Sequence, residues 1–112
     1  MINVCTQPTI EREPGGDFQV CFWVFDVFNY STPFRAMIAD AAHALGRDPC
    51  EHLELPSYLE DEDFIEGAII LETARVRIYF EHARSYLSMA HPSSSVLEEI
   101  LEVLAPLIRI TR

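Results

Sequence analysis

The sequence predicts a single α+β domain over residues 1–112, with two helices packed on a single layer of mostly antiparallel sheet. Two observations predict this class. The chain has 112 residues and is 49% hydrophobic, which suits one domain with one core. Its segments carry apolar residues either at every second position, as in strands, or at helical spacing. The expected order is β-β-α-β-β-β-α, with an optional short final strand.

The first two strands are expected over residues 2–10 and 18–28. The turn between them contains Pro14-Gly15-Gly16-Asp17, the residue types that tight turns prefer, because glycine accepts positive φ and proline fixes its own. The second strand, FQVCFWVFDVF, is almost entirely apolar, which is typical of a central strand covered on both faces. Burial then accounts for its aromatic residues, Trp23 included. The alternative is that one face of this strand is a binding surface.

A helix is expected between Thr32, which suits the N-cap position, and Gly46, which suits the left-handed residue after a helix end. Pro33 then takes the first helical position, where its missing N–H is tolerated. His43 lies off the apolar stripe and is expected to be solvated. The stripe itself has helical spacing and should face the core: Phe34, Met37, Ile38, Ala41 and Leu45.

Three strands in a meander are expected over residues 64–72, 75–81 and 85–91. The middle strand alternates strictly, which puts Val76, Ile78 and Phe80 on the core face. Its other face carries Arg75, Arg77, Tyr79 and Glu81, and the two arginines are interpreted as solvated side chains paired with Glu72 or Glu81. Because Thr73-Ala74 is a poor hairpin turn, a helix over residues 67–76 is the alternative for this region.

A second helix is expected near the end of the chain. Ser95 and Glu98 have capping-box spacing. Pro106 should end or kink this helix, and LIRITR after it is compatible with a short strand. The apolar stripe of the helix is formed by Leu97, Ile100, Leu101 and Leu104.

No residue is assigned to catalysis, a metal or a cofactor. The three cysteines, Cys5, Cys21 and Cys50, are an odd number and widely spaced, so we expect buried free thiols and no disulfide. Cys50 and His52 lack the further ligands that a metal site needs. The chain has no G-x-S-x-G, no H-E-x-x-H and no phosphate-binding glycine loop.

The formal net charge is −10, and all eight basic residues are arginine. This charge opposes binding to nucleic acid and to anionic lipid, and it favours a basic protein partner. The N-terminal segment has no basic stretch followed by an apolar one, and the apolar runs are far shorter than a membrane span. We therefore expect cytoplasmic residence. The oligomeric state is left open.

Half of the negative charge lies in one segment: nine of the eighteen carboxylates fall between Arg47 and Arg75, with no basic residue among them. A solvated loop and an interface for a basic partner both account for such a run. Pro56 should stiffen the segment, and Tyr58 is the kind of aromatic residue that anchors interfaces. The candidate partner-binding residues are Glu54, Tyr58, Glu60, Asp61, Glu62, Asp63 and Glu66.

In small size, acidity and absence of catalytic motifs, the chain resembles the small acidic immunity proteins of bacterial contact-dependent and polymorphic toxin systems. The acidic segment over residues 48–74 adds to this resemblance. It implies a cytoplasmic protein that binds a basic toxin domain, often a nuclease, one to one and occludes its active site. The acidic segment would then stand in for nucleic-acid phosphates.

Two other functions stay open. A small acidic secretion chaperone would present an exposed apolar groove, for instance along CFWVFDVF, and would dimerise. An enzyme or ligand-binding domain would need a deep pocket with convergent polar groups.

Overall fold

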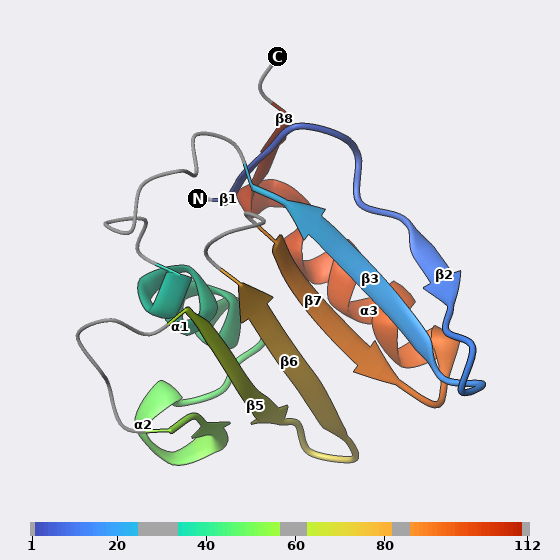
Figure 1. Cartoon of the computed structure of the whole chain (residues 1–112). Coiled ribbons are helices and arrows are strands. Elements are labelled where there is room, and N and C mark those ends of the chain that lie inside the picture. Colours follow the sequence, from blue (N-terminus) through green and yellow to red (C-terminus); the bar gives the residue numbers. More distant parts are fainter. Residues whose placement is uncertain (1, 25–33, 57–62, 82–85, 111–112) are drawn as a thin grey trace.

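The computed structural model describes residues 2–24, 34–56, 63–81 and 86–110 (Figure 1). The fold is α+β, as predicted: a largely antiparallel sheet with helices packed on it. The described strands form an antiparallel six-stranded sheet and a separate parallel pair. In spatial order the large sheet contains β2 (Ile10–Arg12), β3 (Phe18–Trp23), β7 (Tyr86–His91), β6 (Arg75–Glu81), β5 (Phe64–Ile70) and β4 (Leu53–Glu54). The pair is β1 (Ile2–Val4) beside β8 (Ile108–Ile110).

The two long helices lie on the same face of the large sheet, behind it in Figure 1. Phe34 of α1 (Phe34–Ala44) stacks on Phe80 of β6 with ring centroids 4.8 Å apart. From α3 (Ser94–Leu104), Leu97 and Ile100 join the same core cluster as Phe80. Because strand side chains alternate between faces, the buried residues of β3 and β6 fall at every second position, on the side of these helices.

The expected first strand is two strands in the structure. Residues 2–4 pair with β8, whereas residues 10–12 pair with β3. Pro8 lies between them and has no N–H to donate to a ladder, which favours a break at this point. Two further short elements were not predicted, the helix α2 (Pro49–His52) and the edge strand β4. Asp48 caps α2 by accepting a hydrogen bond from the amide of Cys50.

The helix considered over residues 67–76 does not form, because β5 and β6 pair along their whole length. A tight turn joins them, in which the amide of Leu71 donates to the carbonyl of Ala74 at 2.8 Å. The continuous ladder satisfies the backbone groups of both strands, which compensates for the poor turn residues.

The ends of the helices agree with the sequence in part. Gly46 has the expected positive φ, 74°, just after α1, and His43 is exposed; Thr32 and Pro33 lie outside the described residues. The capping box predicted at Ser95 is wrong, since α3 has its N-cap at Ser93 and no side-chain cap hydrogen bond. The hydroxyl of Ser95 instead contacts that of Ser93 at 2.8 Å.

Pro106 acts as a helix terminator, as predicted. It falls within a 3-10 turn (Ala105–Leu107) that follows α3 directly. The chain then forms β8, the short final strand, which lies beside β1 and brings the two ends of the described chain together (Figure 1). No helix in the described ranges is long and apolar enough to cross a membrane.

Gly67, in the middle of β5, is expected to be intolerant of any side chain. A Cβ atom there would collide with the backbone carbonyl oxygen of Glu54 and would approach Leu55 Cδ2 to 2.6 Å. We expect Gly67→Ala to lower the free energy of unfolding by about 1–3 kcal/mol, because the edge strand β4 would have to move. Urea unfolding measures this loss. The control is Gly15→Ala, where a Cβ meets nothing within 4 Å; equal losses in both variants would contradict the close packing of β4 on β5.

Candidate functional site on the open face of the sheet

The face of the large sheet that points away from α1 and α3 carries no described helix (Figure 1). Its side chains come from the alternate positions of each strand, which along β6 are Arg75, Arg77, Tyr79 and Glu81. The strand register sets which of these residues become neighbours. We call this surface the open face.

Four aromatic side chains, one from each of four adjacent strands, form a row across the open face. Trp23 of β3 lies opposite Tyr86 of β7, with ring centroids 4.8 Å apart. Tyr79 of β6 follows at 6.2 Å from Tyr86, and Phe64 of β5 at 6.1 Å from Tyr79. These separations lie in the range where aromatic pairs attract one another. We call these four residues the aromatic row.

The ends of the aromatic row are open to solvent. The exposed fraction of Trp23 is 41% and that of Phe64 is 56%. The prediction that β3 is covered on both faces, with Trp23 buried, is therefore wrong. Phe22 and Val24 are buried as expected, because they point to the helix face. Exposed aromatic surface of this kind is typical of a contact surface.

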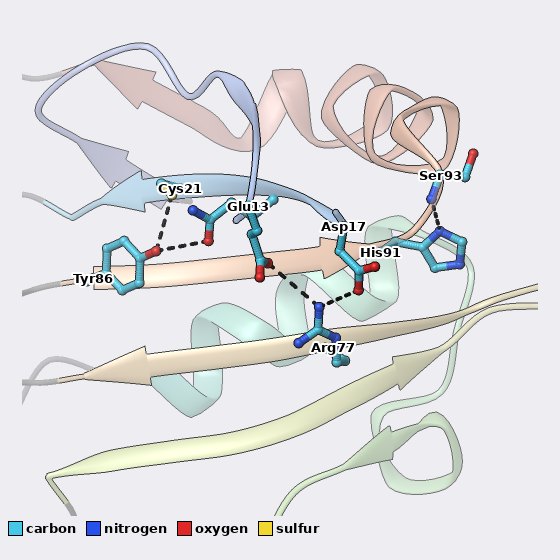
Figure 2. A network of polar contacts seen from close by, with 8 residues as sticks. Glu13, Asp17, Cys21, Arg77, Tyr86, His91 and Ser93 are labelled. Atoms are coloured by element: carbon cyan, nitrogen blue, oxygen red, sulfur yellow. Dashed lines mark hydrogen bonds and ion pairs between the residues drawn. The ribbon is translucent and has the colours of Figure 1, made fainter. Parts of the chain in front are cut away.

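The two arginines of the open face are already paired with carboxylates of this chain. Arg77 donates to Asp17 at 2.7 Å and lies 3.7 Å from Glu13, both at the β2–β3 turn (Figure 2). Arg75 pairs with Glu54 of β4 at 3.2 Å. The expected pairing with Glu72 or Glu81 is wrong, because these long side chains reach across neighbouring strands.

A second polar cluster surrounds Cys21. The hydroxyl of Tyr86 lies 3.2 Å from Cys21 Sγ and donates to Gln19 Oε1 at 3.4 Å (Figure 2). Burial raises the pKa of the Cys21 thiol; the hydrogen bond between Cys21 and Tyr86 lowers it, and the charges of Glu11 and Glu13 raise it further. The net direction is upward, which favours the neutral thiol over a nucleophilic thiolate.

The three cysteines are free thiols, as predicted, but they are not all buried. Cys21 is half-buried, and Cys5 and Cys50 are exposed. Within the described ranges, no group of three His, Cys, Asp or Glu side chains is placed to hold a metal ion.

A hollow of about 610 Å³ lies on the open face beside the aromatic row. Tyr79, Tyr86, Arg77 and Glu66 are among the residues that line it. It is therefore walled by rings and by groups of both charges.

Three of the seven residues predicted from the sequence can be placed. Glu54, Asp63 and Glu66 are all exposed. Glu54 is the carboxylate paired with Arg75. Glu66 lies on the open face, directly opposite Tyr79, and within the described ranges it makes no hydrogen bond or ion pair. The other four, Tyr58, Glu60, Asp61 and Glu62, lie outside the described residues.

Sequence reasoning missed Trp23 and Tyr86 as surface aromatics. The alternation along residues 75–81 did place Tyr79 with the arginines and away from the core. It could not show that the other three rings lie on the same face, since that depends on strand order and register. Comparison with protein-family models, with curated proteins and with solved structures found no significant match.

The Cys21 cluster predicts a shifted pH dependence of thiol alkylation. In a variant with Cys5 and Cys50 changed to serine, the alkylation rate of Cys21 by iodoacetamide should reach half its maximum at a higher pH than for an ordinary thiol. Tyr86→Phe should move this midpoint higher still, because the hydroxyl that stabilises the thiolate is lost. Tyr79→Phe, which changes a ring of the same row, is the control. A midpoint that falls in Tyr86→Phe would contradict the assigned hydrogen bond.

Proposed function

We propose that this protein is an immunity-type inhibitor, which binds a basic toxin domain in the cytoplasm and blocks its active site. A nuclease domain is the partner that fits best, because its cationic site would accept carboxylates in place of phosphates. The observation that carries the proposal is the combination on one surface of unpaired negative charge with exposed aromatic rings.

Half of the carboxylates of the chain belong to the segment between Arg47 and Arg75, which includes α2, β4 and β5. Every described carboxylate of the acidic segment is exposed: Asp48, Glu51, Glu54, Asp63, Glu66 and Glu72. A surface of one sign attracts a partner of the opposite sign and can raise the association rate by about 10 to 1,000-fold. This supports a partner that is strongly basic.

The aromatic row can supply the packed contacts that a long-lived complex needs, which charge alone does not provide. Association rates depend on the electrostatic field, but the lifetime of a complex depends mainly on well-packed contacts at its centre. Tyrosine and tryptophan are the residues that most often provide such contacts. The aromatic row lies beside Asp63 and Glu66, so a basic domain attracted to this edge would meet the rings on contact.

A secretion chaperone is the second candidate, and the exposure of Trp23 favours it. A chaperone of this kind would hold an apolar segment of an effector and would dimerise. An inhibitor would bind a folded basic domain and would remain effective as a monomer. Light scattering of the free protein separates the two, since a stable dimer that binds a hydrophobic dye supports the chaperone.

Co-expression in a bacterial host tests the inhibitor directly. We expect the partner gene to be a neighbouring reading frame that encodes a large exported protein with a basic C-terminal domain. Expression of that domain alone should arrest growth, and co-expression of this protein should restore it. Arrest that persists despite a soluble, folded inhibitor would contradict the proposal.

Charge reversal should slow association with the same toxin domain. The triple variant Glu60→Lys, Glu62→Lys and Asp63→Lys should reduce the on-rate at low salt by at least about 10-fold, with a smaller effect as salt rises. Stopped-flow mixing or surface plasmon resonance measures the rate. The matched control reverses Glu98, Glu99 and Glu102, three exposed carboxylates of α3, which covers the opposite face. Equal slowing in both variants would mean that net charge, and not this segment, steers the partner.

A further inference from the structure

On the open face, the carboxylate of Glu66 meets two aromatic rings, and neither Arg75 nor Arg77 pairs with it. Glu66 and Tyr79 are directly opposite each other on β5 and β6. Phe64 is two residues before Glu66 and lies on the same face of β5. We propose that these three residues form a binding site for an arginine side chain of a basic protein partner.

The geometry of the strands brings the three groups to one place. Opposite residues of an antiparallel pair have Cβ atoms about 4.5–5.5 Å apart, and residues two apart on a strand are separated by about 7 Å. The rings of Phe64 and Tyr79 are 6.1 Å apart and tilted by 30°. The carboxylate of Glu66 therefore lies within reach of a group held against either ring.

The available charge at this site is negative. Arg77 is engaged by Asp17 and Glu13, and Arg75 by Glu54, so neither is paired with Glu66. Glu81 is directly opposite Phe64 and accepts a hydrogen bond from the Tyr79 hydroxyl at 3.2 Å, so it adds a second carboxylate beside the rings. A carboxylate that pairs with no residue in the described ranges and lies beside two partly exposed rings is a site for a cation.

Among cations, the guanidinium group of arginine fits this arrangement best. It is planar, so it can stack on a ring while its N–H groups donate to a carboxylate in pairs. The ammonium group of lysine is a point charge and offers no such plane. The proposal rests on the proposed function only in taking a basic protein as partner, and it names the side chain by which that partner would be held.

Other occupants of the open face fit its charge less well. A single-stranded nucleic acid would stack on the rings but needs a basic groove for its phosphates. A second copy of this chain also has a net charge of −10, so the two copies would repel each other. An arginine of a basic protein satisfies both the rings and the carboxylate.

Binding of a short peptide of alternating arginine and glycine tests the site on the intact protein. Trp23 is the only tryptophan and belongs to the aromatic row, so its fluorescence reports on this face. Backbone amide NMR shifts locate the peptide. We expect shifts on β5, β6 and β7. The affinity for the arginine peptide should be about two- to fivefold higher than for the same peptide with lysine in place of arginine.

Two single variants define the site, and a third is the control. Phe64→Leu removes a ring that is 56% exposed, and Glu66→Gln removes the charge at nearly constant size. Each variant should weaken binding of the arginine peptide about two- to fivefold. The loss caused by Glu66→Gln should be smaller at high salt, because salt screens the charge. Glu98→Gln, at an exposed position of α3, is the matched control and should leave the affinity for the peptide unchanged. Thermal unfolding verifies that all three fold alike.

Several results would overturn the arginine site. These are equal binding of a glutamate twin of the peptide, shifts confined to α3, or full affinity in both Phe64→Leu and Glu66→Gln. The arginine site would also be overturned if a single-stranded oligonucleotide bound the open face more tightly than the peptide, or if the protein formed a dimer through this face. Failure of this site leaves the inhibitor intact if growth rescue still occurs. If rescue fails while the arginine peptide still binds, the inhibitor function is contradicted and the arginine site is supported.

Discussion

The placement of both long helices on one face of an antiparallel sheet is the constraint on which the rest of the structure depends. Strand side chains alternate, so covering one face fixes half of them as core and leaves the other half to solvent or to a partner. Phe22, Ile78, Phe80 and Leu87 fill the covered face. Burial under α1 and α3 cannot account for the aromatic row, because it lies on the opposite face.

The pattern of charge on the open face follows from internal pairing. Arg77 bridges β6 to the β2–β3 turn, and Arg75 links β6 to the edge strand β4. These exposed ion pairs contribute little to stability, about 0–1 kcal/mol each. Their larger effect is to engage Arg75 and Arg77 elsewhere, so that neither arginine pairs with Glu66 beside the exposed rings. Attraction for a cation and a hydrophobic contact surface are thereby combined.

Much of the fold could be predicted because its helices and strands follow from local sequence patterns. The apolar stripe of α1, the strict alternation of residues 75–81 and the effect of Pro106 are properties of short stretches of chain. The errors lie where a residue depends on distant neighbours. Trp23 was placed in the core because its strand is apolar on both sides, and the arginines were given partners close in sequence.

The class of the fold, the helix and strand periods, and the excess of carboxylates between Arg47 and Arg75 are all readable in the amino-acid sequence. The identity of the open face, and the row that Trp23, Phe64, Tyr79 and Tyr86 form on it, depend on how the strands are arranged in space. The physical reason is that cross-strand neighbours are set by strand order and register. Residues far apart in the chain become adjacent through hydrogen-bonded ladders, which no local spacing encodes.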